Sequence, residues 1–212
     1  MTVVLQALYL IFLYAAFAVL HTVLAGLDIK RRIAKKYPGI MPWYRLLYNI
    51  FAIISFYYVY ELSPRIDIKL YDLQYPYDFI ILFFQLQMLL GILWTLRYFN
   101  AKEFFGIDQI LRKLKGSYNA LSLDENSELI IKGPYLWCRH PLYLFFILFL
   151  ALRPYMFLDY LISLICITLY FYIGSIYEEK RMIDKFGDHY REYIKHIPRL
   201  IPYHIFFKKN KG

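Results

Sequence analysis

Long runs without a charged residue dominate this sequence and limit the folds open to it. Residues 3–26, 79–96 and 160–177 contain no Lys, Arg, Asp or Glu. A helix needs about 20 mostly apolar residues to cross the hydrocarbon core of a bilayer. The chain is 60% hydrophobic, whereas a soluble domain is about 45–50% apolar. These runs therefore predict membrane-spanning helices.

Two weaker segments extend this pattern. Residues 46–60 are uncharged and reach spanning length with their flanking residues, and residues 142–158 are interrupted only by Arg153 and Pro154. We therefore predict an all-α integral membrane protein of five transmembrane helices. The first run lacks a basic start and is longer than the about 7–15 residues of a signal-peptide core, so we expect it to be a retained helix.

The expected arrangement is a single membrane domain over residues 1–212, with the first three helices within residues 1–98. The last two crossings then form a hairpin. After the last crossing, "YEEKRMIDKF" continues the helical pattern until Gly187, which favours a helix end. Asp188 is expected to cap a short helix that Pro198 ends. The prediction is a C-terminal helical extension in the cytoplasm.

The basic residues predict the orientation of these helices. Of the 25 Lys and Arg residues, 22 fall in residues 27–45, 97–139 and 178–212, which a five-helix topology places on one side. Connections rich in Lys and Arg face the cytoplasm. We therefore expect the N-terminus outside, the C-terminus in the cytoplasm and the active site at the cytoplasmic face. The net charge of +9 is explained without nucleic acid, and no nucleic-acid partner is expected.

The cytoplasmic connection before the hairpin has two expected parts. Phe104, Ile107, Leu111 and Leu114 recur at helical spacing beside basic residues, which predicts an amphipathic helix on the inner leaflet. Residues 119–129 are polar and acidic, and we expect a mobile loop there.

Several kinds of chemistry have no signature in the sequence. It contains no phosphate-binding loop, no dinucleotide-binding glycine motif and no zinc-protease motif. The five histidines are scattered, so no metal site is expected. Cys138 and Cys166 do not make a disulfide framework and are expected to be reduced thiols.

The segment "GPYLWCRHPLY", residues 133–143, points to a binding site. Pro141 suits the first turn of a helix, which places His140 at the cap. Helix N-termini attract anions, and Arg139 and His140 add hydrogen-bond donors to the same place. The motif predicts a small anion site at the membrane surface. The alternative is that Arg139 contacts lipid headgroups while His140 only caps the helix.

Two adjacent carboxylates extend this hypothesis. Glu178 and Glu179 begin the cytoplasmic continuation of the last helix, and the hairpin brings them to the depth of Arg139 and His140. A zwitterionic ligand would suit this pairing. Its carboxylate would face the helix N-terminus, and its ammonium would face a glutamate.

These residues also carry a family resemblance. "GPYLWCRHPLY", followed by "EEKRMIDKFGDHYREYIKHIPRLIP", resembles the C-terminal signature of the isoprenylcysteine carboxyl methyltransferase and phospholipid methyltransferase superfamily, over residues 130–202. The resemblance implies S-adenosylmethionine as the methyl donor. The residues that it implies around the donor are Tyr135, Arg139, His140, Tyr143, Glu178, Glu179, Tyr190 and Tyr193.

The N-terminal half carries a second resemblance. "HTVLAGLDIKRRI", "YRLLYNIFAI" and "AKEFFGIDQI" resemble the methanethiol S-methyltransferase and NnrU-like branch of the same group. In the predicted topology His21 and Asn49 lie near the cytoplasmic ends of the first two helices. Polar groups in membrane helices are costly and often functional, although near an end they can simply reach headgroups.

One position departs from the superfamily pattern. Many members have Arg directly before the "I-P" of the tail, where this chain has His196. Lys195 and Arg199 flank this position and could substitute for the arginine. An imidazole does not replace the two-pronged geometry of a guanidinium, which weakens a carboxyl-methylation reading. A thiol acceptor needs a base, and His196 or His21 is the candidate catalytic residue.

The function that this resemblance implies is an S-adenosylmethionine-dependent membrane methyltransferase. Its acceptor would be a small thiol or another lipid-soluble molecule, and membrane lipids would surround it. The alternatives are an isoprenylcysteine-type carboxyl O-methyltransferase, a phospholipid N-methyltransferase and a non-catalytic NnrU-like accessory protein. The oligomeric state is left open.

Overall fold

The computed structural model describes residues 1–120, 123 and 128–203, and most of these residues are helical. The chain forms two compact units, each built from two separate stretches. The first unit contains residues 1–65 and 100–127, and the second contains residues 66–99 and 128–212. The expected single domain over residues 1–212 stays a prediction.

The first unit consists of helices. They are α1 (Val3–Ala25), α2 (Leu27–Lys36), α3 (Met41–Leu62), α5 (Ala101–Phe105) and α6 (Ile107–Leu114). Thr2 caps α1 by accepting a hydrogen bond from the backbone of Leu5. The ring of Phe17 on α1 packs edge-on against Phe56 on α3. The Tyr44 hydroxyl ties the two helices further by donating to the carbonyl oxygen of Leu24, 2.6 Å away.

The predicted amphipathic helix is divided into α5 and α6. Gly106 separates them in a left-handed conformation, with φ of 85°. A side chain there would lie 2.8 Å from the backbone nitrogen of Leu46, so only glycine lets the two short helices contact α3. Asn49 holds α5 by donating to the carbonyl of Phe104, 2.8 Å away. Most of the predicted loop over residues 119–129 lies outside the described residues.

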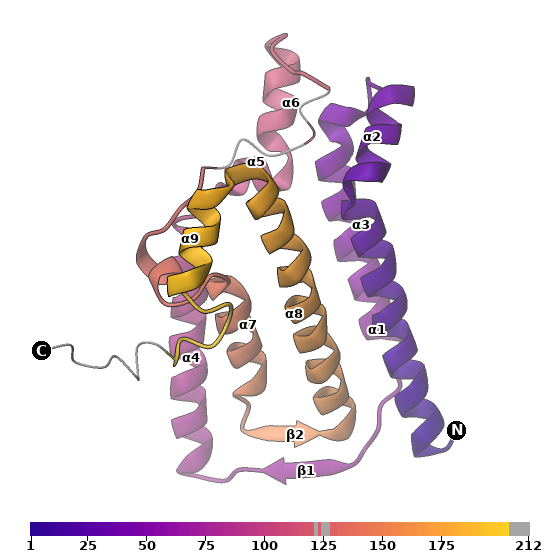
Figure 1. The fold of residues 1–212 in the computed structure, drawn as a ribbon. Helices are drawn as coiled ribbons and strands as arrows, with labels where there is room; N and C mark the ends of the chain where they lie inside the picture. The colour runs from indigo at the N-terminus through magenta and orange to yellow at the C-terminus, as the bar shows by residue number, and fades with distance from the viewer. Residues whose placement is uncertain (121–122, 124–127, 204–212) are drawn as a thin grey trace, which may run out of the picture. The chain divides into compact units, whose positions relative to one another are not determined.

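The second unit combines helices with a small sheet. Its elements are β1 (Lys69–Asp72), α4 (Tyr77–Leu96), the 3₁₀ turn η1 (Gly133–Leu136), α7 (Pro141–Ala151), β2 (Tyr155–Phe157), α8 (Leu158–Phe186) and α9 (Asp188–His196). The strands β1 and β2, which were not predicted from the sequence, pair antiparallel with Lys69 opposite Phe157 (Figure 1). The connection before α4 and the connection between α7 and α8 therefore meet at one end of this unit.

The predicted helix over residues 142–158 is wrong in its C-terminal part. α7 ends at Ala151, and residues 155–157 form β2. Pro154 explains the difference, because it disfavours helical backbone at the preceding residue and cannot donate a backbone hydrogen bond. α7 has 11 residues, which span about 16 Å, roughly half of the hydrocarbon core.

α7 packs closely along α4. Gly91 allows this contact, because a Cβ atom there would lie 2.6 Å from the ring of the buried Phe145. Gln85 reinforces the pair by donating to the carbonyl oxygen of Phe149 across the interface, 2.9 Å away.

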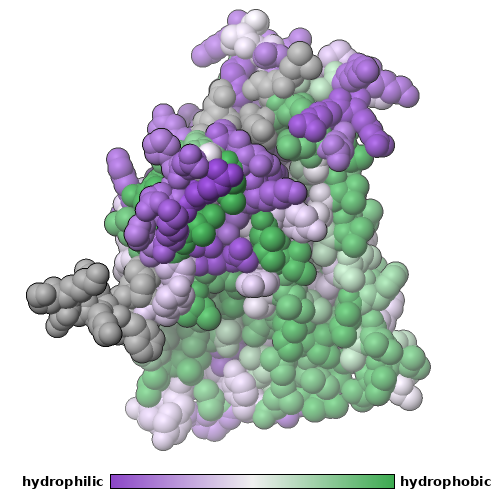
Figure 2. All heavy atoms as spheres, in the orientation of Figure 1, coloured by the Kyte–Doolittle hydropathy of each residue, from purple (hydrophilic) through white to green (hydrophobic). Residues whose placement is uncertain are grey.

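Within the described residues, α1, α4 and α8 are long and apolar enough to cross a membrane. Figure 2 shows hydrophobic residues over the long helices and hydrophilic residues gathered on α2 and α9. The prediction of a mostly helical integral membrane protein is confirmed at this level. The predicted count of five transmembrane helices is not confirmed, because α3 is not among these spans and α7 is a shorter apolar helix.

The C-terminal extension follows the prediction in outline. α8 runs for 29 residues and ends before Gly187, whose φ is 57°. Asp188 does not cap the next helix, since it is the first residue of α9 and Gly187 occupies the cap position. The Asp188 carboxylate instead accepts a hydrogen bond from Arg191, 2.9 Å away. α9 ends two residues before Pro198.

Candidate functional site

The Arg-His-Pro segment begins α7 as predicted. Pro141 is the first helical residue, and His140 occupies the cap position without a side-chain capping bond. The chain reaches this point through η1, which Gly133 starts with φ of 57°. A Cβ atom at Gly133 would lie 2.5 Å from the ring of Tyr98, so glycine is required at this turn.

The C-terminal tail is attached to the same segment by its backbone. The backbone N–H of Arg139 donates to the carbonyl oxygen of Pro198, 2.9 Å away, and that of His140 donates to the carbonyl of Arg199, 3.1 Å away. This pairing joins two parts of the predicted signature that are separated by about 60 residues. It brings the Arg199 side chain to the start of α7.

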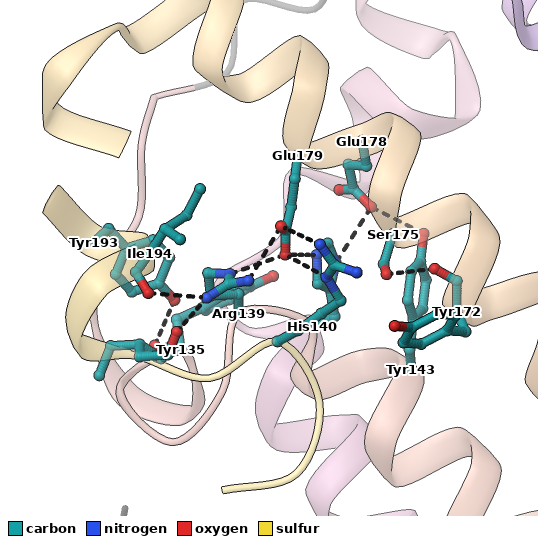
Figure 3. A network of polar contacts seen from close by, with 12 residues as sticks. Tyr135, Arg139, His140, Tyr143, Tyr172, Ser175, Glu178, Glu179, Tyr193 and Ile194 are labelled. Atoms are coloured by element: carbon teal, nitrogen blue, oxygen red, sulfur yellow. Dashed lines mark hydrogen bonds and ion pairs between the residues drawn. The ribbon is translucent and has the colours of Figure 1, made fainter. Parts of the chain in front are cut away.

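Glu179 lies at the centre of the resulting polar cluster (Figure 3). Arg139 donates to both of its carboxylate oxygens, at 2.8 and 3.1 Å. Arg199 does the same at 3.1 and 2.9 Å. The Nε2 atom of His140 lies 3.1 Å from Oε1 of Glu179. The Glu179 side chain is only 6% exposed, so these bonds offset the cost of burying its charge.

The remaining donors of Arg139 point to the tail. Its Nη1 atom donates to the carbonyl oxygens of Ile194, 3.2 Å away, and of Ile197. Arg139 is buried. Through these hydrogen bonds it connects the start of α7 with α8 and with the end of α9. This geometry does not support the alternative that Arg139 contacts lipid headgroups.

Glu178 differs from its neighbour in exposure. Its side chain is 42% exposed, although its Oε2 atom lies 3.4 Å from Nδ1 of the buried His140. The Tyr143 hydroxyl donates to the same oxygen, at 3.0 Å. One of the two adjacent carboxylates is therefore enclosed and saturated with donors, while the other is oriented by protein groups on one side and open on the other.

The ring of His140 contacts both carboxylates with different nitrogen atoms. Burial by itself would lower the pKa of His140, but the contacts with Glu178 and Glu179 raise it above the ordinary value of 6.5. His140 also stacks on Tyr143, with the ring centroids 5.3 Å apart, and Tyr143 stacks on Phe171 at 4.8 Å. The stack fixes the orientation of the imidazole.

Three further predicted residues surround this cluster without entering it. The Tyr193 hydroxyl donates to the backbone carbonyl of Tyr135, 2.5 Å away, which ties α9 to η1. Burial raises the pKa of Tyr135 to about 12, and it also raises the pKa of Tyr190 and Tyr193. These hydroxyls stay protonated at neutral pH, so they can donate but do not act as bases.

Cys138 lies beside the cluster and is completely buried. Burial raises the pKa of its thiol to about 12. Because the thiolate is the reactive form of cysteine, Cys138 is not a nucleophile in this environment. Cys138 forms no disulfide in the structure.

The two candidate bases are not part of the described cluster. The side chain of His196 is 71% exposed at the end of α9, and its Nε2 atom lies 2.9 Å from Glu192. His21 belongs to the first unit, where both ring nitrogens lie within 2.9 Å of the Tyr48 hydroxyl. Their catalytic roles stay predictions, and the position of His196 does not favour one.

Arg199 was expected only as a possible substitute for the missing arginine, and it was not among the predicted site residues. It flanks the position where the superfamily pattern has Arg, and that proximity was its signal in the sequence. The chain therefore supplies a guanidinium from the tail, three residues after His196. Its Cζ atom lies 5.5 Å from the centroid of the Tyr172 ring on α8.

Comparison with known proteins gives one family and several relatives. Residues 108–184 match the isoprenylcysteine carboxyl methyltransferase (ICMT) family. The matched range includes the Arg-His-Pro segment and both glutamates, but it does not include the tail with Arg199. Methanethiol S-methyltransferase 1 of Bradyrhizobium diazoefficiens is 35% identical over 49% of this chain and 35% of its own length. No solved structure matches the chain significantly.

Two other relatives match most of the chain. The methanethiol S-methyltransferase of Pseudomonas deceptionensis is 26% identical over 91% of this chain and 71% of its own length. That of Mycobacterium tuberculosis is 26% identical over 90% of this chain and 76% of its own length. The predicted resemblance is thereby confirmed: the chain is similar to methyltransferases of the isoprenylcysteine carboxyl methyltransferase superfamily, and within it to the methanethiol S-methyltransferases.

Proposed function

We propose that this protein is an S-adenosylmethionine-dependent membrane methyltransferase whose acceptor is a small thiol. The observation that carries the proposal is the difference between the two adjacent glutamates. Glu179 is enclosed by Arg139, His140 and Arg199, whereas the Glu178 carboxylate is oriented by His140 and Tyr143 and remains 42% exposed. The names of the relatives support the thiol.

The exposed carboxylate fits one part of the donor. S-adenosylmethionine supplies a methyl group on a positively charged sulfonium and carries an amino-acid ammonium. An oriented carboxylate with an open side is suited to accept hydrogen bonds from an ammonium, and such charge-assisted bonds are among the stronger ones. We assign this role to Glu178, with Tyr143 and His140 holding its orientation.

The buried groups around Glu179 position the surrounding backbone and do not contact the methyl donor. Arg139 and Arg199 use guanidinium donors on Glu179, and Arg139 also holds two tail carbonyls. The superfamily resemblance implied that Arg139 and Glu179 surround the donor. In this geometry they fix the tail and the start of α7, so that Glu178 is presented in one orientation. Such preorganisation removes an entropic cost from binding.

A thiol acceptor must lose its proton before it attacks, because the thiolate is the nucleophile. His140 is a poor base for this step, since two carboxylates favour its protonated form. Methyl transfer would then form a carbon–sulfur bond to the thiolate and break one at the sulfonium, with the proton already released. We propose that ionisation of the thiol itself sets the pH dependence.

The deciding experiment is a methyl-transfer assay on the full chain, purified in detergent. Radiolabelled S-adenosylmethionine is supplied with a small alkyl thiol, a prenylated cysteine acid or an aminophospholipid. We expect label in the thioether product only. Label in a methyl ester or in phospholipid would support the corresponding alternative, and donor binding without transfer to any acceptor would support a non-catalytic protein.

A series of thiols with different acidity tests how the acceptor ionises. If each thiol ionises by itself, the pH at half-maximal rate follows the pKa of that thiol. A base on the protein would instead give one common midpoint for the whole series.

We also propose five membrane crossings, with the N-terminus outside and the active site at the cytoplasmic face. The distribution of Lys and Arg supports this topology. The pairing of β1 with β2 supports this topology within the second unit. The topology puts the connection before α4 and the connection between α7 and α8 on the outer side, and these two connections carry the paired strands. Reporters fused after Asp72 and after residue 211 should report opposite faces, and one shared face would exclude this arrangement.

A further inference from the structure

Arg181 extends the polar site along α8, one helical turn beyond Glu178. The two residues are three positions apart, and residues at this spacing are neighbours on one face of a helix, with their Cβ atoms about 5–6 Å apart. Arg181 is exposed. Its positive charge acts on the Glu178 carboxylate and on the Tyr143 hydroxyl. A free cation therefore lies beside the carboxylate that is open on one side.

This arginine differs from other bases at the same helical spacing. Three other acids are followed by a base three residues later on one helix, and each pair forms an ion pair, at 3.7 Å in Asp28–Arg31, 2.9 Å in Asp188–Arg191 and 2.7 Å in Glu192–Lys195. Arg181 forms no hydrogen bond or ion pair within the part of the chain that the structure describes. Glu178 is instead held from α7, where Tyr143 donates to its Oε2 atom and His140 contacts the same oxygen (Figure 3). An acid and a base on one helix face are thus kept apart.

The other cations of the site are already bonded to the protein. The carboxylate of a zwitterionic ligand was expected at the start of α7. There, Arg139 donates to both oxygens of Glu179 and to two carbonyl oxygens of the tail. Arg199 also donates to both oxygens of Glu179, and His140 contacts both glutamates. A ligand carboxylate would have to compete with Glu179 for these donors, whereas the guanidinium of Arg181 is not engaged by any described acid.

The charges of Glu178 and Arg181 match those of an α-amino acid. Such a ligand carries an ammonium and a carboxylate on the same carbon atom, so its two charges are close together. A glutamate and an arginine one turn apart on a helix present the opposite charges at a similar spacing. A guanidinium is well suited to the carboxylate, because it can donate two parallel hydrogen bonds to it.

We propose that Arg181 binds the carboxylate of the methionyl part of S-adenosylmethionine, while Glu178 accepts hydrogen bonds from its ammonium. This inference rests on the proposed function and adds a residue that selects the donor. Tyr143 and His140 keep Glu178 from pairing with Arg181, so both charges stay available to the ligand. Tight binding should then require the carboxylate as well as the ammonium of the donor.

The first test changes only the ligand. Decarboxylated S-adenosylmethionine retains the adenosine, the sulfonium and the ammonium but lacks the carboxylate. Calorimetric titration of the full chain in detergent measures the affinity of each compound. We expect S-adenosylmethionine to bind about tenfold more tightly, which corresponds to one hydrogen bond between charged groups. Equal affinities would overturn the proposal.

The second test changes the protein. Arg181→Gln should weaken S-adenosylmethionine about tenfold and leave the decarboxylated compound unaffected, so that the ratio of the two affinities falls to about one. Lys180→Gln is the matched control, because Lys180 is also exposed, carries the same charge and points to another side of α8. The ratio should stay near tenfold in this variant. An unchanged ratio in Arg181→Gln would place the carboxylate elsewhere, such as at the start of α7, and an equal fall in both variants would indicate general charge attraction. Either result would overturn the proposal.

The titrations separate this inference from the function on which it rests. If the unchanged protein bound neither compound, the proposed function and this inference would both be overturned. If it bound S-adenosylmethionine without any dependence on the carboxylate or on Arg181, only this inference would be overturned. Thermal unfolding checks that Arg181→Gln is folded, and the comparison of the two ligands on the unchanged protein does not depend on that variant.

Discussion

Arg199 donates to both carboxylate oxygens of Glu179, with its Nε atom 3.1 Å from Oε1 and its Nη2 atom 2.9 Å from Oε2. Arg139 approaches the same carboxylate from the start of α7. One buried acid thus connects the C-terminal tail, α7 and α8. Because Arg199 lies outside the matched residues 108–184, the geometry of the site also depends on a contact from outside the region that matches the family.

Replacing Arg199 with Ala should therefore destabilise the protein and weaken donor binding together. Hydrogen bonds to charged groups contribute about 1.5–3 kcal/mol, and Lys should restore little because it lacks the two-pronged geometry. Thermal unfolding in detergent and calorimetric titration with S-adenosylmethionine measure the two effects. Arg191→Ala is the control, since the side chain of Arg191 bonds only the exposed Asp188 within the part of the chain that the structure describes. Equal behaviour of both variants would contradict the role of Arg199.

The two adjacent glutamates should respond differently to the same change. Glu179→Gln leaves two guanidinium groups facing a neutral amide in a buried place, and breaking such a buried pair costs about 3–5 kcal/mol of folding free energy. Glu178→Gln should fold normally but bind S-adenosylmethionine more than tenfold more weakly, since a charge-assisted hydrogen bond is worth about 1.5–3 kcal/mol. Glu192→Gln, at an exposed acid beside His196, serves as the control. Unchanged affinity in folded Glu178→Gln would reject the donor assignment.

The pH dependence of stability should identify His140. Its contacts with Glu178 and Glu179 raise its pKa in the folded state above 6.5. The stabilisation from protonated His140 is therefore complete below about pH 6.5 and is lost as the pH rises through the folded pKa. We expect the gap in unfolding temperature between the wild type and His140→Gln to shrink from pH 6 to pH 9. A gap that widened from pH 6 to pH 9 would have the wrong sign and would contradict the role of His140.

His196 can be tested directly by substitution. Because its side chain is 71% exposed and bonded to Glu192, His196→Arg should leave thiol methylation and its pH profile unchanged. The rate is measured with one thiol between pH 6 and pH 9, together with donor affinity. A lower rate with intact donor binding would restore His196 as the candidate base.

The contact between α4 and α7 predicts the effect of a single methyl group. Gly91→Ala places a Cβ atom against the ring of Phe145, and overpacking of this kind costs about 1–3 kcal/mol. Gly174→Ala on α8 is the matched control, because its Cβ atom meets nothing within 4 Å. Thermal unfolding in detergent should separate the two variants, and equal stability would show that Phe145 moves aside without cost.

The sequence by itself determined the helices and the parts of the site. Uncharged runs predicted α1, α4 and α8, because helix formation in a membrane depends on contiguous apolar residues. Gly187 ended α8 and Pro141 began α7, as local backbone chemistry requires. The Arg-His-Pro and Glu-Glu motifs were also predicted to meet, since a hairpin brings its ends to one depth.

Only the tertiary structure decided which of these polar groups are buried and which residues they bind. Enclosure of Glu179 and exposure of Glu178 cannot be read from two identical neighbours, because burial depends on residues that are distant in the chain. Arg199 reaches Glu179 through the backbone pairing of residues 139–140 with 198–199. The β1–β2 pair likewise joins residues more than 80 positions apart. Local patterns determine where helices form, whereas long-range packing determines which polar atoms lose water and must find a partner in the protein.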